Sequence, residues 1–153
     1  VLRCGNIYGG GDLNWDRLIP GVTKWLLNKE QPVLRTKGQF KRDWVYVEDV
    51  ADAYISVTNA LLDENKEVSG AYNFSSNDYL SVMDIYEKIC NILEKKYVEP
   101  LIQEDSEFEI EDQYLSSKKI RDELNVAAKI GIDEGLKRTI NWYKSNLNIT
   151  EKN

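Results

Sequence analysis

The sequence predicts an α/β fold in which short β-rich segments alternate with amphipathic helices. Its 153 residues suit one domain and are enough to enclose a core. Hydrophobic residues make up 42% of the chain and aromatic residues 10%, as in a globular protein. Apolar residues recur at helical spacing in several windows, and β-forming runs bounded by turn residues lie between them. No internal repeat or linker divides the chain, so residues 1–153 are expected to form one unit.

The first expected element is a short strand, Val1 to Cys4, followed by a glycine-dense turn that runs to Asp12. A turn of this kind before a helix can place backbone N–H groups around an anionic ligand. Glycines also serve a simple tight turn, and the spacing alone leaves both interpretations open. Because a binding loop normally follows a strand embedded in a sheet, we expect the chain to be a piece of a larger protein. The first strand is then expected to pair with a neighbouring molecule or to lie disordered.

The remaining elements are expected to alternate along the chain. Helices are expected over 16–26, 48–62, 81–93, 117–124 and 133–147, because apolar positions recur there at a spacing of three or four. Strands are expected over 32–35, 40–47, 70–75 and 97–102, with a turn at 76–78 and an edge or loop over 103–112. The expected helix caps are Asn14 or Asp16, the capping box of Ser81 with Asp84, Ser116 or Ser117, and Asp133.

Composition excludes several classes of function. The net charge is −6 with scattered basic residues, which argues against nucleic acid as a partner. The chain has no His, which removes His-based acid–base chemistry and almost every catalytic zinc site. Cys4 and Cys90 form no disulfide framework or metal motif, so a cytoplasmic location is expected. No apolar run approaches the roughly 20 residues that span a bilayer, so no membrane partner is expected.

Two arginines are candidate anion ligands. Arg42 opens a β-rich run, where its guanidinium can bind a diphosphate bidentately or form an exposed ion pair with Asp43. Arg17 stands at a helix start, where a cation opposes the helix dipole, so it can be placed there for an anion. Neither a Walker loop nor a G-x-G-x-x-G fingerprint occurs.

Other candidate sites have simpler explanations. The acidic run 104–112 lacks the spacing of a calcium loop, so a solvated surface is expected and no metal site is predicted. Tyr46 and Tyr54 are not followed by Lys four residues later, so neither forms a Tyr/Lys pair for hydride-transfer chemistry.

Several motifs together resemble the C-terminal half of the extended short-chain dehydrogenase/reductases, the NAD-dependent epimerase/dehydratase family. They are Arg3 to Gly9, Arg17 to Pro20, Arg42 to Val50, Tyr72 to Phe74, Ser117-Lys118, Glu134 to Leu136 and Trp142-Tyr143. Within the family, the sequence looks most like the CDP-glucose 4,6-dehydratases in three segments: residues 5–12, 16–20 and 111–115. The resemblance implies the last strand of a Rossmann sheet followed by a smaller mixed α/β substrate-binding domain.

The resemblance also implies roles for individual residues. Asn6 and Arg42 would contact the diphosphate of a nucleotide sugar, and Arg17 with the backbone of Leu18 would lie along the nucleotide. Asn73 would belong to the same pocket. The main chain around Cys4 and Gly5 would approach the nicotinamide end of NAD.

By the same resemblance, the full-length enzyme would be a lyase that oxidises C4 of an NDP-hexose with NAD, eliminates water across C5 and C6 and returns the hydride. Its glycine-rich NAD loop and catalytic Tyr-x-x-x-Lys pair would lie in an N-terminal Rossmann part upstream of Val1. This chain would then contain no catalytic residue, be inactive alone and hold no NAD, and the full-length protein would be a homodimer. A UDP-glucose type 4-epimerase and a non-catalytic nucleotide-sugar-binding module stay open. An arginine that many members carry has no counterpart in 103–112, which leaves the base undecided.

Overall fold

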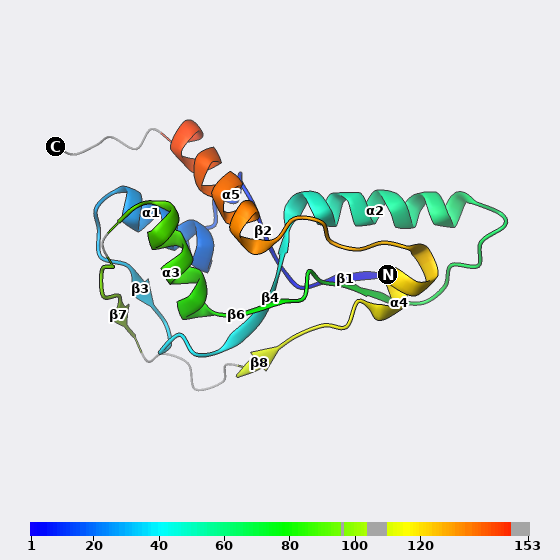
Figure 1. Ribbon diagram of the computed structural model, residues 1–153, viewed down its shortest axis with the longest axis horizontal. Helices are drawn as coiled ribbons and strands as arrows, with labels where there is room; N and C mark the ends of the chain where they lie inside the picture. Colours follow the sequence, from blue (N-terminus) through cyan, green and yellow to red (C-terminus); the bar gives the residue numbers. More distant parts are fainter. Residues whose placement is uncertain (96, 104–109, 148–153) are drawn as a thin grey trace.

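The computed structural model describes residues 1–95, 97–103 and 110–147. Helices α1, α3 and α5 gather at one end of an elongated molecule, and helices α2 and α4 lie at the other end with the N-terminus (Figure 1). The long strand β4 (Lys41–Tyr46) runs between the two groups. The mixed α/β architecture predicted from the sequence is confirmed.

The N-terminal strand is paired within the chain. β1 (Leu2–Cys4) runs parallel to β5 (Tyr72–Phe74), with Cys4 opposite Phe74. The Val1 ammonium group donates to the Gly70 carbonyl at 2.8 Å, and this contact extends the pairing to the chain terminus. The expectation that this strand lies disordered is therefore wrong, and its pairing with a neighbouring molecule stays a prediction. The strand expected over 70–75 supplies the partner.

A second sheet is built around β4. Strand β2 (Asn6–Tyr8) pairs with it in parallel, and β6 (Asp78–Ser81) pairs with it antiparallel on the way into α3. The short β8 (Asp112–Gln113) adds to the start of β4, and β3 (Val33–Leu34) pairs separately with β7 (Leu101–Ile102). Two of these strands differ from expectation: Asn6–Tyr8 lies within the predicted glycine-dense turn, and Asp78–Ser81 begins at the last residue of the turn predicted at 76–78.

Helices α1 (Leu18–Leu27), α3 (Val82–Ile92) and α5 (Ile132–Asn146) pack against one another. Their apolar faces enclose the larger core with β2 and β4. The helix residues of this core include Ile19, Val22, Leu26, Ile85, Tyr86, Ile89, Leu136 and Ile140. The smaller core joins α2 (Val47–Leu62) and α4 (Lys118–Leu124) to the β1–β5 pair.

The capping box predicted for α3 forms, a predicted serine stands at the N-cap of α4, and the caps predicted for α1 and α5 are wrong. Ser81 Oγ accepts from the Asp84 amide at 3.0 Å, and Asp84 Oδ2 accepts from the Ser81 amide at 2.8 Å, which confirms the capping box of α3. Arg17 rather than Asn14 or Asp16 precedes α1, without a side-chain cap. Gly131, not Asp133, is the N-cap of α5. Ser117 is the N-cap residue of α4, but its hydroxyl donates to the Ser75 carbonyl at 3.3 Å, and it is Ser116 Oγ that accepts from the Lys118 amide, at 3.4 Å.

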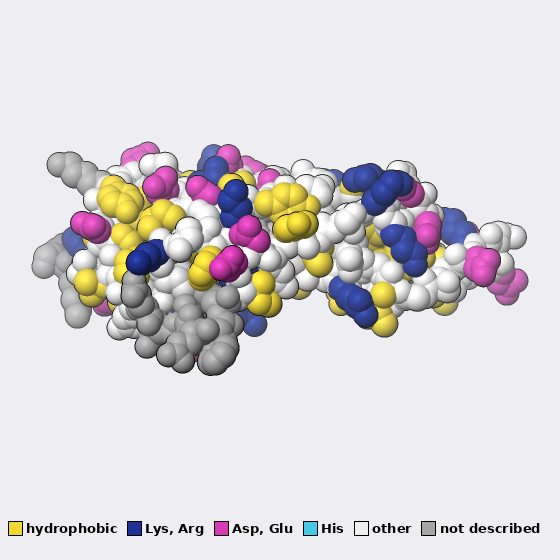
Figure 2. Space-filling model, turned by 90° about the horizontal axis from the view of Figure 1, so that it is seen from below, with side chains coloured by type: hydrophobic (Ala, Val, Ile, Leu, Met, Phe, Trp, Pro, Cys, Tyr) yellow, Lys and Arg dark blue, Asp and Glu magenta, His cyan; other side chains and the backbone are white. Residues whose placement is uncertain are grey.

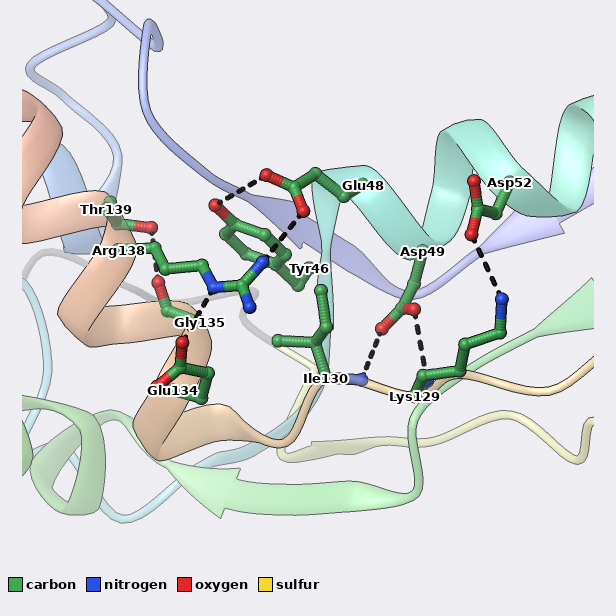
Figure 3. Close-up of polar contacts among 10 residues, drawn as sticks. All are labelled: Tyr46, Glu48, Asp49, Asp52, Lys129, Ile130, Glu134, Gly135, Arg138 and Thr139. Atoms are coloured by element: carbon green, nitrogen blue, oxygen red, sulfur yellow. Dashed lines mark hydrogen bonds and ion pairs between the residues drawn. The ribbon is translucent and has the colours of Figure 1, made fainter.

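A buried carboxylate joins α2 to the segment before α5 (Figure 3). Asp49 is 3% exposed, and its two oxygens accept from the amides of Lys129 at 3.0 Å and Ile130 at 2.9 Å. Nearby, Arg138 of α5 donates to Glu134 at 2.7 Å and to Glu48 of α2 at 2.9 Å. These contacts fix the start of α2 relative to the start of α5.

Charged groups of both signs are spread over the surface. On the face shown in Figure 2, Lys and Arg side chains are interspersed with Asp and Glu at both ends of the molecule. Among the described residues, no helix is long and apolar enough to cross a membrane, and no cluster of metal-ligating side chains occurs. Of the acidic run 104–112, residues 104–109 lie outside the described part of the chain.

Candidate functional site

The glycine-dense turn lies between β2 and α1 and is packed closely against two other elements. A Cβ atom on Gly9 would lie 2.3 Å from Val47 Cγ1, and one on Gly10 would lie 2.4 Å from Trp142 Cγ. Both distances are far below a normal van der Waals contact. The first two glycines therefore allow the turn to lie against α2 and α5, which is a structural role that the sequence alone could not separate from ligand binding.

A cavity of about 510 Å³ lies beside this turn. It is lined from three parts of the sequence: Asn6 comes from β2, Arg17 and Leu18 from the start of α1, and Arg42 from β4. Tyr8, Gly5, Ile7, Gly9, Asp12, Ile19, Pro20, Trp44 and Val82 complete the lining. The fold thus brings together five of the seven predicted site residues, namely Gly5, Asn6, Arg17, Leu18 and Arg42.

The two arginines of the cavity are held in different ways. Arg17 donates to the Asp12 carboxylate at 3.1 Å, and its side chain is 63% exposed. Arg42 donates through Nη1 to the carbonyls of Lys41 and Glu111, each at 3.0 Å. Asp43 does not provide the exposed ion pair that composition suggested, because its side chain is buried and accepts from the Leu115 amide at 3.0 Å. Burial raises the pKa of Asp43.

The first turn of α1 adds positive potential to the cavity. This turn has no acidic residue and no side-chain cap, so no side chain of the turn itself offsets the positive end of the helix dipole. Pro20 in the same turn lacks an N–H. Leu18 and Ile19 line the cavity, which places this end of the helix at its wall.

A second cavity of about 440 Å³ adjoins the first, because both are lined by Arg17, Leu18 and Val82. Its other lining residues are Trp15, Asp16, Val22, Trp25, Val33, Leu34, Arg35, Thr36 and Gln103. Arg35 and Asp16 approach to 3.8 Å across the surface, where both are largely exposed. The sequence had singled out neither Trp15 nor Arg35 nor Gln103. Only the pairing of β3 with β7 brings Gln103 to this place.

Cys4 and Asn73 line neither cavity. They lie in β1 and β5, where Asn73 stands opposite Arg3. Cys4 is half-buried, and burial raises the pKa of its thiol, so it is not an activated nucleophile. Gly5 connects β1 to β2, where a Cβ atom would come within 2.8 Å of the Asp43 carbonyl oxygen. Cys4 and Gly5 nevertheless lie at the carboxyl end of β1, the end where parallel α/β sheets bind ligands.

One Tyr and Lys do stand four residues apart, at Tyr114 and Lys118. Tyr114 lies before α4 and is 70% exposed, with its ring against Tyr79 at 5.6 Å between centroids. Lys118 forms an ion pair with Asp122 one turn along the helix. Neither Tyr114 nor Lys118 lines a cavity described above, so this spacing does not form a catalytic pair at the site.

The sequence model of the NAD dependent epimerase/dehydratase family matches residues 1–75. A CDP-glucose 4,6-dehydratase of Salmonella typhimurium is 29% identical over 146 residues, which are 94% of this chain and 40% of that protein. The chain is thus similar to this family's sequence model over residues 1–75 and to the dehydratase over nearly the whole length of the chain. A dTDP-glucose 4,6-dehydratase of Escherichia coli is 30% identical over 159 residues, covering 99% of this chain and 42% of that protein.

Solved structures of extended short-chain dehydrogenases share the fold. The UDP-glucose 4-epimerase of Thermotoga maritima, solved with UDP-glucose, has a TM-score of 0.83 at 22% identity, over 95% of this chain and 45% of its own. The dTDP-glucose 4,6-dehydratase of Bacillus anthracis, solved with NAD, has a TM-score of 0.81 at 24% identity, over 97% of this chain and 45% of its own. The chain therefore spans less than half the length of these relatives.

Proposed function

We propose that this chain is the C-terminal, nucleotide-sugar-binding half of an NAD-dependent NDP-hexose 4,6-dehydratase, of the CDP-glucose type. The observation that carries the proposal is the cavity that Asn6, Arg17, Leu18 and Arg42 line together. Its residues come from three separate elements of a fold shared with nucleotide-sugar enzymes.

The chemistry of the cavity suits a diphosphate. Arginine is the preferred partner of phosphate oxygens, because its planar guanidinium donates two parallel hydrogen bonds. Arg17 and Arg42 supply two such groups, the start of α1 supplies a favourable dipole, and Asn6 supplies an amide. These groups would hold the substrate and compensate its charge, which is the orienting contribution to catalysis.

The adjoining cavity would receive the nucleotide base. The two cavities meet at Arg17 and Leu18, so a ligand with its diphosphate against Arg42 can extend past these residues toward Trp15 and Arg35. Each cavity lies in the size range usual for small-molecule sites, about 300–1,000 Å³. Trp15 offers an aromatic face and Arg35 a donor for base recognition.

The proposed cofactor is NAD, held mainly by an N-terminal Rossmann part. When bound, NAD supplies reversible hydride transfer at C4 of the sugar. The chain's own contribution would be the backbone of Cys4 and Gly5, at the carboxyl end of β1. In our proposal Asn73 belongs to the wall of the same pocket. The chain alone would show no turnover and negligible NAD affinity.

The outer side of α2 supports the docking of such an N-terminal part. From Ala53 to Leu62 the helix carries no charged residue. Tyr54, Ile55, Leu61 and Leu62 are 52%, 60%, 61% and 77% exposed, and their spacing places them on one face of the helix. A helix that is apolar on both sides is usually buried on both sides. In the described residues β1 pairs only with β5, whereas parallel strands normally belong to larger sheets covered by helices.

The expected homodimer and the cytoplasmic location belong to the same proposal.

A 4-epimerase is the second candidate, because a UDP-glucose 4-epimerase matches the fold as closely as the dehydratases do. The full-length gene product separates the two. A dehydratase converts CDP-glucose to a 4-keto-6-deoxy product that is followed by its absorbance, whereas an epimerase interconverts UDP-glucose with its C4 epimer. A protein that binds both and converts neither would be a non-catalytic module.

Arg42 provides the direct test of the binding function. We expect the Arg42→Glu variant to bind CDP-glucose at least about a hundredfold more weakly in calorimetry, because it loses charge-assisted hydrogen bonds and adds a repelling carboxylate. Lys41→Glu is the matched control: it changes the net charge equally, and Lys41 does not line the cavity. Equal affinities for the Arg42→Glu variant and the unaltered chain would refute the assigned role.

A further inference from the structure

Tyr143 of α5 forms a hydrogen bond to the backbone of the loop between β2 and α1. The Tyr143 hydroxyl donates to the Asp12 carbonyl oxygen at 2.7 Å, across 131 positions of sequence. The Tyr143 ring lies 5.9 Å from that of Trp15 and 5.3 Å from that of Trp142, between ring centroids. Tyr143 is fully buried, and burial with the nearby Asp12 charge raises its pKa to about 12, so the phenol stays a donor at neutral pH.

Asp12 connects this hydrogen bond to the cavity, because its side chain contacts Arg17. Its carboxylate accepts from the Asn14 amide at 3.0 Å through one oxygen and from Arg17 Nη1 at 3.1 Å through the other. Asp12 and Arg17 both line the first cavity, whereas Tyr143 lines neither cavity. The hydrogen bond to Asp12 therefore connects Tyr143 to the cavities through the loop.

We propose that Tyr143 is a positioning residue for the nucleotide-sugar site: by holding the Asp12 carbonyl it fixes the loop whose carboxylate orients Arg17 toward the diphosphate. This inference rests on the proposed function of the cavity. Arg17 is long and mostly exposed, so an unguided guanidinium would lose much rotamer freedom on binding. A guanidinium already oriented by Asp12 loses less, which strengthens binding without adding a contact to the ligand.

The test is Tyr143→Phe, which keeps the ring and its contacts with Trp15 and Trp142 and removes only the hydroxyl. Tyr86→Phe is the matched control, because Tyr86 is equally buried, donates to the carbonyl of Val98 and lines neither cavity. Both variants are first compared with the unaltered chain by thermal unfolding.

The first measurement is amide hydrogen exchange without ligand. The amides of Asn14, Asp16 and Arg17 donate within the loop, to Asp12 Oδ1, Asn14 Oδ1 and the Asn14 carbonyl. We expect them to exchange about two- to tenfold faster in Tyr143→Phe and at the unaltered rate in Tyr86→Phe, as for the loss of one hydrogen bond. Unchanged exchange in Tyr143→Phe would overturn the proposal, whether or not the chain binds a nucleotide sugar.

The second measurement is the affinity for CDP-glucose, with inorganic pyrophosphate as a second probe. We expect Tyr143→Phe to bind about two- to tenfold more weakly and this loss to disappear in an Arg17→Gln background, because Tyr143 acts through Arg17. A loss that persists in full in that background, or no loss at all, would overturn the proposal. If the unaltered chain binds neither probe, the proposed function fails, and the exchange rates alone decide the role of Tyr143 in the loop.

Discussion

Asp49 and Asp52 stand one turn apart on α2, and both contact Lys129, but in different surroundings (Figure 3). Asp49 is buried and accepts from two backbone amides. Asp52 accepts from Lys129 Nζ at 3.2 Å, where the two side chains are 60% and 73% exposed. Replacing either aspartate by asparagine therefore removes one charge from the same helix. The change at Asp49 disrupts buried hydrogen bonds, whereas the change at Asp52 removes only an exposed ion pair.

The expected magnitudes follow from these contacts. In Asp49→Asn the new amide group cannot accept a hydrogen bond, so one charge-assisted bond is lost and one buried N–H is left without its partner. We expect a loss of about 2–4 kcal/mol in the free energy of unfolding. Asp52→Asn loses only an exposed ion pair, worth less than about 1 kcal/mol. At a urea m-value of about 2 kcal/mol/M, the midpoint falls by about 1–2 M for Asp49→Asn and by less than about 0.5 M for Asp52→Asn.

Urea unfolding followed by circular dichroism at pH 7 measures both midpoints, and equal m-values for the two variants ensure a like comparison. Similar losses in the two variants would show that α2 is not held by the amides of Lys129 and Ile130. A loss below about 1 kcal/mol in Asp49→Asn would refute the reasoning in the same way.

Three further predictions test other parts of the structure. Gly10→Ala places a Cβ atom 2.4 Å from Trp142 Cγ and is expected to lower the free energy of unfolding by about 1–3 kcal/mol. Gly131→Ala is the control: its Cβ atom meets nothing within 4 Å, so we expect a loss of about 1 kcal/mol at most. Thermal unfolding of both variants measures the two losses. The hydrogen bonds of the α3 capping box lower the pKa of Asp84, so its stabilisation is present above the pKa of the unfolded state and lost as pH falls through the lowered value. The destabilisation in Asp84→Asn is therefore expected to shrink from pH 6 to pH 2 in urea unfolding, and a constant difference would contradict this. Leu62→Ser is expected to change the stability of this chain by less than about 0.5 kcal/mol, because Leu62 is 77% exposed, and a larger loss would place it in the chain's own core.

Features that depend on neighbours in sequence were the most predictable. The capping box of Ser81 and Asp84 involves residues three apart, and both of its hydrogen bonds form as expected. The apolar stripe of α2 predicts its buried side only in part: Val50 and Ala53 are buried, whereas Tyr54, Leu61 and Leu62 of the same stripe are exposed. The start of α1 was harder, because Asn14 instead accepts from the Asp16 amide within the loop. A capping residue chosen from local sequence can thus be used by a competing turn.

Features that depend on distant partners were not predictable from local pattern. Asn6–Tyr8 was expected to be part of a turn and Asp78–Ser81 was not expected to be a strand, and both form strands because each pairs with β4. The cavity depends on the same pairing, since the parallel register of β2 with β4 brings Asn6 and Arg42 to one wall. The family resemblance predicted Asn6 and Arg42 as site residues, whereas Trp15, Gln103 and Tyr143 could be identified only from the tertiary structure.

The acidic character of the chain is compatible with an anion-binding cavity. Charges more than about 8 Å apart in solvent are largely screened at physiological ionic strength, so the net charge of −6 contributes little at the cavity. The local balance is different, because Arg17 and Arg42 outnumber Asp12 among the charged residues of the lining. Asp12 then has two opposing effects: it lowers the positive potential that attracts a diphosphate, and it orients the arginine that binds it. Because the proposal makes orientation outweigh the charge, we expect Asp12→Asn to weaken CDP-glucose binding in calorimetry even though it makes the cavity more positive. Tighter binding in that variant would show that potential, and not position, governs Arg17.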